Sequence, residues 1–367
     1  MLERKFSVKK LVGGTVAAVA LMSTFASAQA GILTDQVMTP MVVSGAPPDS
    51  PGARVDPNTA DSKFSGVVSI QILSGGSGYI CSGALVGARS VISAGHCVDI
   101  EGNGVKLDLN APGNAVNVVF NASTVVGDPG RAVIAASAVS IHQDYQGFGN
   151  CPTGVSGFCV NDDVAVITLS KDAPAAAKIY KVSTAPVTPG TRIMIAGYGT
   201  SGNGHDGHNV SPSYRIKRTG QNYMDTYAGD DENGWGGKPE IYYADFDGVD
   251  ANGVLRDTFC EWEILCSPIL PNHIEANIGG GDSGGPSFIE MYGEMVLVAN
   301  NTFGNRAGYT SGAFGSYFGG MILGSYADYL VQATNGRIAL VPEPTGIALF
   351  GLGALALFGA RRRSIKK

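Results

Sequence analysis

Short hydrophobic runs, rich in β-branched residues, recur along the chain and are separated by turns rich in Gly, Ser, Asn and Pro. Runs of about four to eight such residues between turn-forming residues are typical of β-strands. We therefore expect an all-β protein built from short antiparallel strands. The clearest candidates lie at 67–73, 117–120, 164–169, 191–196 and 295–298.

One segment near the C-terminal end has the periodicity of an amphipathic helix. Ser325 is placed to cap its first turn, and the following apolar residues recur at i, i+3, i+4 and i+7. This spacing puts them on one helix face, so we expect a short C-terminal helix. The face consists of Tyr326, Tyr329, Leu330 and Ala333.

The N-terminal end has the pattern of an export signal. Four basic residues within the first ten precede an apolar stretch from 11 to 25 and a series of small residues from 26 to 30. This is the anatomy of a secretory signal peptide. We expect a signal peptide at 1–30, which the secretion machinery would cleave after Ala28 or Ala30. Residues 31–54, rich in Pro and small residues, should form a pro-segment.

The C-terminal end has the pattern of a second targeting signal. Val341-Pro342-Glu343-Pro344 is followed by an apolar run from 345 to 360 and then by three arginines. This three-part pattern resembles the PEP-CTERM sorting signal of Gram-negative bacteria. The resemblance implies an exosortase partner, transient membrane association through residues 336–367, and a final location in the periplasm, at the cell surface or in the extracellular matrix. A simple C-terminal membrane anchor is the alternative.

Composition and charge narrow the class of protein further. The chain has 367 residues, of which 52 are glycine and only 15% are charged, as suits a loop-rich β protein. Its formal net charge is −6, and both end segments are basic, so the body of the chain is more acidic than the whole. Nucleic acid is therefore excluded as an expected partner.

Three short segments carry candidate catalytic chemistry. Ser283 lies in the glycine-rich segment 281–286, His96 lies in a small-residue turn beside Cys97, and Asp163 precedes an apolar strand. A serine hydroxyl needs a base to take its proton and an acid to orient that base. Asp162 is the alternative acid, but Asp163 directly precedes the alternating strand.

The order of these residues along the chain discriminates between hydrolase classes. An α/β-hydrolase needs a histidine after its serine, but the last histidine is His273, which precedes Ser283. The subtilisin order needs an acid before the histidine, and Asp56 and Asp61 upstream of His96 lack a comparable strand-end pattern. The order His96, Asp163, Ser283 is that of the chymotrypsin class.

The three segments resemble the signature blocks of the trypsin/chymotrypsin-like serine peptidases, and Gly197-Tyr198-Gly199 resembles the entry to that family's second barrel. The likeness spans most of the chain. It implies two packed antiparallel six-stranded β-barrels, with a short C-terminal helix, over a peptidase domain at 55–335. The active site would lie between the barrels.

The resemblance also implies roles for the site residues. Ser283 would attack the scissile carbonyl of a protein or peptide substrate, His96 would transfer the proton, and Asp163 would orient the imidazole. The amides of Gly281 and Ser283 would form the oxyanion hole. Asn277 would lie at the base of the substrate pocket, with 301–304 along its wall.

The family's activation mechanism gives a further expectation. Cleavage after Arg54 would free the amine of Val55 to pair with Asp282, beside the nucleophile. The opening at Val55 departs from the family's usual Ile-Val-Gly-Gly.

An exported protein permits disulfides, and the chain has six cysteines. Cys81 with Cys97 resembles the family's histidine-loop bridge, while Cys151 with Cys159 and Cys260 with Cys266 are close in sequence. We expect no cofactor and no metal site of cysteine or histidine, and we interpret His205 and His208 as solvated loop residues. Calcium binding to the acidic loops at 230–233 or 245–250 is the alternative that remains.

Two functions are compatible with these observations. The favoured one is an exported serine endopeptidase that acts through an acyl-enzyme. The other is a catalytically silent, exported binding or matrix protein on the same fold.

Overall fold

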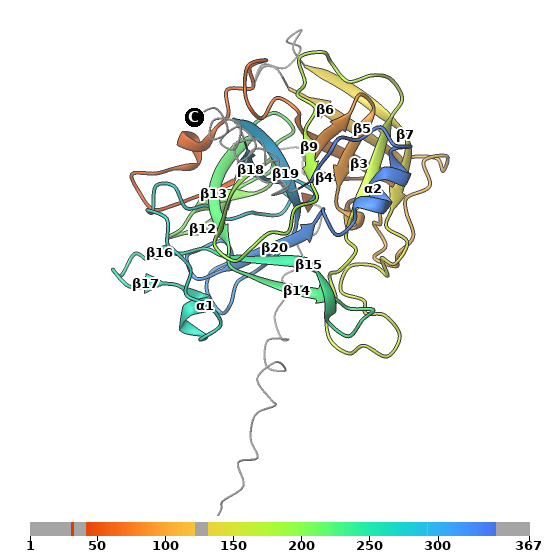
Figure 1. Ribbon diagram of the computed structural model, residues 1–367. Helices are drawn as coiled ribbons and strands as arrows, with labels where there is room; N and C mark the ends of the chain where they lie inside the picture. The colour runs from red at the N-terminus through yellow and green to blue at the C-terminus, as the bar shows by residue number, and fades with distance from the viewer. Residues whose placement is uncertain (1–30, 33–41, 122–130, 292, 343–367) are drawn as a thin grey trace, which may run out of the picture.

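A closed antiparallel barrel forms the first half of the fold (Figure 1). The computed structural model describes residues 31–32, 42–121, 131–291 and 293–342. Within it the strands follow the order β4-β3-β6-β7-β8-β5, and β5 pairs back with β4 to close the barrel. β1 (Gly31–Ile32) pairs antiparallel with Tyr79 and Ile80 of β4. The barrel strands are β3 (Val67–Ser74), β4 (Ser77–Gly87), β5 (Ser90–Ser93), β6 (Ala115–Phe120), β7 (Ala132–Ile141) and β8 (Ala165–Leu169).

Successive side chains of β3 point alternately into the core of the first barrel and toward the second half of the fold. Val68, Ile70 and Ile72 project into the first barrel and are fully buried there. Val67 belongs instead to a cluster that contains Tyr198 and other residues of the second half. Because successive strand residues face opposite sides, one strand serves both cores.

The second half is a larger sheet whose strands follow the order β13-β10-β18-β19-β20-β15-β14. The side chain of Asn222 on β13 donates to the carbonyl of Asp245 on β15 at 2.7 Å, which joins the first strand of this order to the second-last. The sheet thereby wraps into the second barrel. Its strands are β10 (Thr191–Gly197), β13 (Arg218–Met224), β14 (Thr226–Asp230), β15 (Gly236–Asp245), β18 (Pro286–Met291), β19 (Glu294–Asn305) and β20 (Tyr317–Ile322).

Short elements complete the fold. β2 (Val42–Ser44) pairs in parallel with β11 (Ser201–Asn203), which pairs with β12 (Gly207–Val210). β9 (Lys181–Ser183) lies between β19 and β21 (Leu340–Val341). The remaining elements are the hairpin of β16 (Gly248–Val249) and β17 (Leu255–Arg256), α1 (Thr258–Glu261) and two 3-10 turns at Pro51–Arg54 and Gly95–Cys97.

The architecture predicted from the sequence is confirmed. All five expected strands are present, and the C-terminal helix is α2 (Ala327–Ala333), with Leu330 fully buried. The expected cap is wrong. Ser325 donates its hydroxyl to the carbonyl of Pro239 at 2.6 Å, and the helix begins after Tyr326 with no side-chain cap. None of the helices in the described part of the chain is long and apolar enough to cross a membrane.

Two segments expected to lie outside the domain are partly built into it. Val42, Val43 and Ser44 of the expected pro-segment are buried in β2. Leu340 and Val341 of the expected C-terminal linker pair with β9. The expected signal peptide at 1–30 and the tail from 343 onward lie outside the described residues.

Candidate active site

His96 and Asp163 form a buried pair at the junction of the two barrels. His96 lies in the 3-10 turn after β5, and Asp163 lies just before β8, which pairs with β5. The carboxylate of Asp163 makes two contacts with His96. Its Oδ2 lies 2.7 Å from Nδ1, and its Oδ1 accepts the backbone N–H at 2.8 Å. The acid therefore fixes both the ring and the turn that carries it.

The neighbouring acid, Asp162, faces a different histidine. Its Oδ1 lies 2.9 Å from Nδ1 of His142, and its backbone N–H donates to the hydroxyl oxygen of Tyr326 at 3.1 Å. The φ of Asp162 is 61°, a left-handed conformation that turns the two adjacent carboxylates in different directions. Of the two candidate acids, the structure brings Asp163 to His96.

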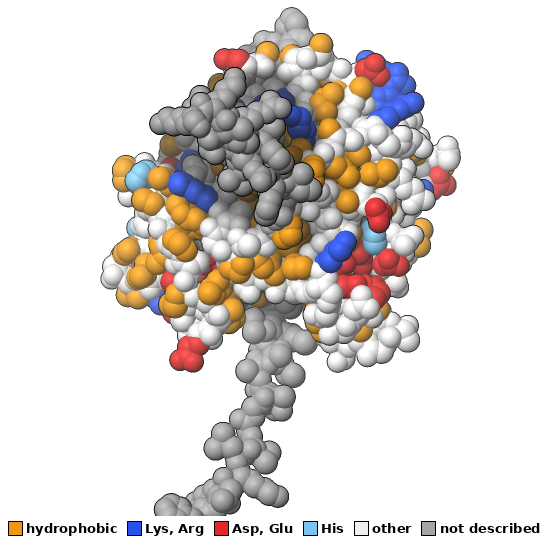
Figure 2. All heavy atoms as spheres, viewed as in Figure 1, with side chains coloured by type: hydrophobic (Ala, Val, Ile, Leu, Met, Phe, Trp, Pro, Cys, Tyr) orange, Lys and Arg blue, Asp and Glu red, His pale blue; other side chains and the backbone are white. Residues whose placement is uncertain are grey.

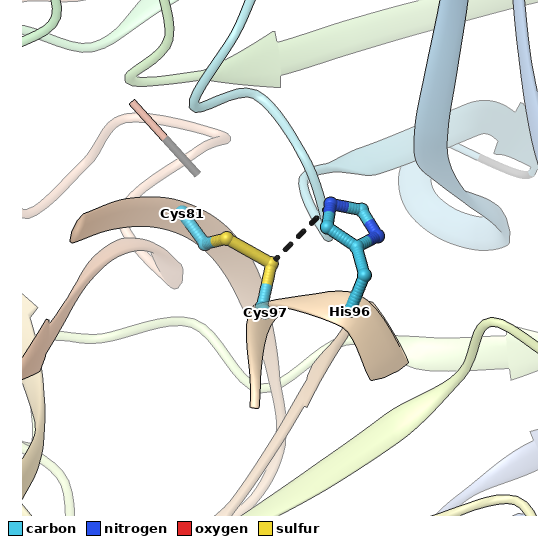
Figure 3. A group of neighbouring side chains, drawn as sticks. All are labelled: Cys81, His96 and Cys97. Atoms are coloured by element: carbon cyan, nitrogen blue, oxygen red, sulfur yellow. Dashed lines mark hydrogen bonds between the residues drawn. A yellow bond between two sulfur atoms is a disulfide. The ribbon is translucent and has the colours of Figure 1, made fainter. Parts of the chain in front are cut away.

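The Cys81–Cys97 disulfide ties the histidine turn to β4 (Figure 3). Sγ of Cys97 lies 4.0 Å from Nε2 of His96. A disulfide sulfur carries no proton to donate and no thiolate to bind a metal, so this group of three side chains is not a metal site. The other two disulfides, Cys151–Cys159 and Cys260–Cys266, are the remaining pairs expected from the sequence.

The loop that carries Ser283 is held by both barrels. The carbonyl of Ser283 accepts the N–H of Ser82 on β4 at 2.8 Å, and the N–H of Gly284 donates to Asn301 on β19 at 2.6 Å. Sγ of Cys97 lies 3.6 Å from the same Ser283 carbonyl oxygen. These contacts place the serine loop directly beside the turn that carries His96.

Glycine is required at two positions of this loop. Gly281 has φ of 100° and Gly284 has φ of 77°, both in the region that side chains disfavour. A Cβ at Gly284 would lie 2.1 Å from Oγ of Ser93. The glycines therefore allow the tight turn that the oxyanion-hole prediction for Gly281 and Ser283 needs.

Asp282 is buried and accepts backbone amides rather than an amine. Its carboxylate takes the N–H of Gly199 at 2.7 Å and that of Gly279 at 2.9 Å. Burial raises the pKa of Asp282 to about 6, against the effect of these amides and of the charge of Arg218. The amides hold Asp282 and thereby the nucleophile loop.

The structure does not bring Val55 to Asp282. With the chain intact, the N–H of Val55 lies 3.5 Å from the carbonyl of Gly52, and the residue bridges to Arg218. The side chain of the preceding Arg54 is 10% exposed and pairs with Asp49 at 2.5 Å. The prediction that a freed Val55 amine pairs with Asp282 applies to a cleaved chain and stays a prediction; in the uncut chain this segment is held in the domain by the Arg54–Asp49 ion pair.

A cavity of about 110 Å³ lies beside the nucleophile loop, with Asn277 in its lining. The side-chain amide of Asn277 donates to Oγ of Ser316 at 2.8 Å, which closes this part of the pocket with neutral groups. Of the expected wall, Gly304 lines the cavity, whereas the Asn301 side chain bonds Tyr242 inside the barrel.

Two residues near the site were not expected. His208 is not a solvated loop residue, because it lines the cavity with its Nε2 3.2 Å from the carbonyl of Ile278, and burial lowers its pKa. Phe148, in the loop stapled by Cys151–Cys159, packs against the His96 ring at a centroid distance of 5.0 Å. A histidine in a polar loop and a lone aromatic residue carry no sequence signal for these places.

The two acidic loops differ in their surroundings. At the β14–β15 turn, Asp230, Asp231 and Glu232 come together, and acidic side chains gather in this region of the face shown in Figure 2. In the other loop, Asp245 and Asp247 lie together with Asp257, which lies outside the expected range.

The two barrels, with a histidine–aspartate pair and a glycine-flanked serine at their junction, define the chymotrypsin-like class of folds. The chain belongs to the trypsin family: the family model Trypsin matches residues 56–245, more than half of the sequence. The PEP-CTERM protein-sorting motif matches residues 340–363 and indicates export in Gram-negative bacteria. Both resemblances noted in the sequence are thereby confirmed. A search of curated proteins finds no match for the chain.

Proposed function

We propose that this protein is an exported serine endopeptidase with the triad His96, Asp163 and Ser283. The observation that carries the proposal is the buried contact between Nδ1 of His96 and Asp163, located beside the loop of Ser283. An acid on Nδ1 leaves Nε2 as the base and stabilises the imidazolium that forms when the serine is deprotonated.

The reaction would proceed in two stages. Ser283 attacks the scissile carbonyl while His96 takes its proton, and His96 then gives this proton to the leaving amine. Water hydrolyses the acyl-enzyme by the same route in reverse order. The amides of Gly281 and Ser283 would stabilise the oxyanion, and a donor of this kind contributes about 2.7 to 4 kcal/mol.

The proposal extends to location and partners. A signal peptide at 1–30 and an exosortase acting on the C-terminal motif would deliver the enzyme to the periplasm, the cell surface or the extracellular matrix. Protein or peptide substrates follow from the proposed chemistry. The second candidate, a catalytically silent binding or matrix protein, shares the fold and the sorting motif but needs no reactive serine.

Covalent labelling separates the two candidates. A fluorophosphonate reacts only with a serine that a base activates, so we expect the exported protein to be labelled and Ser283→Ala to be unlabelled. Ser325→Ala, which removes a hydroxyl bonded to the carbonyl of Pro239, is the matched control and keeps its label. An unlabelled but folded native protein would favour the silent candidate.

A further inference from the structure

A compact group of carboxylates lies at the end of β15, outside the triad. Asp245 ends this strand, Asp247 follows it, and Asp257 caps α1. One oxygen of each lies within 4.8 Å of those of the other two. The three residues are 1%, 3% and 8% exposed, so the group is enclosed by protein.

Asp247 contributes an oxygen to this group, and its Oδ1 has no hydrogen-bond partner among the described residues. This Oδ1 is shielded from solvent, and the same holds for Oδ1 of Asp245. Two backbone amides also contact the group: Phe259 donates to Oδ2 of Asp245 at 2.7 Å, and Cys260 donates to Oδ1 of Asp257 at 3.0 Å. The side chain of Asp225, another buried acid, forms a hydrogen bond with that of Asp245. Buried carboxylates are normally paired, bound to a metal or neutralised by a proton, so a bound cation would allow these oxygens to stay ionised.

Basic side chains in the described part of the chain do not supply that cation. Arg256, the adjacent residue in sequence, pairs with Asp250 at 2.8 Å, and none of the ion pairs found there includes Asp245, Asp247 or Asp257. Two more buried acids, Asp225 and Glu275, add negative charge near Asp247.

We propose that Asp245, Asp247 and Asp257 bind a calcium ion. The donors are all carboxylate oxygens, which hard cations prefer, and the group contains neither the sulfur nor the imidazole that transition metals favour. Calcium loses its water more readily than magnesium and accepts an irregular set of oxygens, which suits an enclosed group of this kind.

The calcium site braces the wall of the candidate substrate pocket. Between the ligands Asp245 and Asp247, Phe246 exchanges backbone hydrogen bonds with Gly315 and Ser316. Next to the ligand Asp257, Thr258 donates its hydroxyl to the carbonyl of Gly315 at 2.5 Å. Ser316 in turn receives the Asn277 amide at the pocket. Calcium therefore orders the pocket wall through these contacts, a consequence for activity that rests on the proposed function.

The binding test uses the exported protein with Ser283→Ala, so that self-digestion does not interfere and the result is independent of activity. Calcium chloride is titrated into chelator-treated protein by calorimetry, and thermal unfolding is followed with and without calcium. We expect saturable binding and a higher Tm with calcium. Asp247→Asn in the same background should lower the affinity at least about tenfold and remove most of the Tm increase.

Asp250→Asn is the matched control. Asp250 is an acid of the same loop, but it pairs with Arg256 and is not one of the three proposed calcium ligands. It should retain calcium binding and the Tm increase. If Asp247→Asn left the calcium affinity unchanged, calcium would bind elsewhere, for example at the acids of the β14–β15 turn, and the proposal would be overturned. Absence of binding to the Ser283→Ala protein would overturn it as well.

A separate measurement addresses the pocket. With Ser283 intact, calcium removal should lower kcat/KM for a peptide substrate in the native protein and in Asp250→Asn to similar extents. Calcium binding without any peptidase activity would leave the metal site in place and reject only the proposed function. Activity that is unaffected when calcium is removed from a calcium-binding protein would overturn the bracing role.

Discussion

Asp162 Oδ1 lies 2.9 Å from Nδ1 of His142, so two adjacent aspartates serve two different histidines. The left-handed backbone at Asp162 separates them. This arrangement makes the two acids distinguishable by experiment, although they are neighbours in sequence.

We expect Asp163→Asn to lower kcat by about 10⁴-fold, because an amide no longer holds His96 in the required tautomer. Asp162→Asn should lower kcat far less, since its partner His142 does not contact the serine loop in the described interactions. Steady-state kinetics on a peptide substrate, with Tm measured for both variants, checks this. Equal losses of kcat in two folded variants would contradict the assignment of Asp163.

The neutral pocket predicts a preference for small, uncharged residues before the scissile bond. A cationic side chain would have to be desolvated in the cavity of about 110 Å³ without a counter-charge from Asn277. A peptide library should therefore yield few cleavages after Arg or Lys. Asn277→Asp should raise the relative rate for Lys at least about tenfold, since it supplies the missing charge. A native profile dominated by Arg and Lys would show that another acid reaches the pocket.

The environment of Arg54 predicts that the bond after it resists cleavage in the folded protein. Its guanidinium pairs with Asp49 and donates to the carbonyls of Ile274 and Glu275 at 2.9 and 3.1 Å. Cleavage would require these contacts to open. We expect N-terminal sequencing of the active protein to find the Arg54–Val55 bond intact, and a mature N-terminus at Val55 would contradict this.

The same contacts predict an effect on stability. Removing one partner of a buried ion pair typically costs about 3 to 5 kcal/mol, and this partly buried pair should cost less, so Arg54→Gln should lower Tm by a few degrees. Arg89→Gln is the control, because Arg89 forms an exposed pair with Asp172 and such pairs contribute little. Similar Tm decreases in both variants would indicate that the Arg54 contacts contribute no more to stability than the exposed Arg89–Asp172 pair.

Glu240 should make the stability of the folded protein depend on pH. Burial and the nearby carboxylates, including Asp162, raise its pKa from 4.5 to about 7. Its contribution to stability is therefore fully present below about pH 4.5 and is lost as pH rises through 7, when the folded protein must hold the ionised form. Glu240→Gln keeps an acceptor for Asn161 and has no charge to bury. Its Tm advantage over native protein should grow between pH 5 and pH 8.

Glu290→Gln is the control for this measurement, because Glu290 forms an exposed pair with Lys63. Its Tm difference from native protein should stay nearly constant over the same pH range. A constant difference for Glu240→Gln would mean that Glu240 does not change its ionisation in this interval.

The strands and the candidate triad were predictable because their signals are local. A β-branched run predicts its own strand, and His96, Asp163 and Ser283 each carry recognisable neighbours. Other features depend on contacts between distant segments. His208 reaches the pocket through β12, whose neighbour β11 pairs with β2 near the start of the domain. Asp257 joins Asp245 and Asp247 only when the intervening loop folds back. Ser325 failed as a cap because a carbonyl on another segment, that of Pro239, accepts its hydroxyl.

The pairing of β21 with β9 has a mechanical consequence for an anchored form of this protein. The matched sorting motif begins at residue 340, within β21, so it starts inside the sheet of the second barrel. If the proposed tail-anchored form exists, its domain would be attached at a fixed point of the second barrel. The proposed active site would then act first on targets displayed close to the attachment surface.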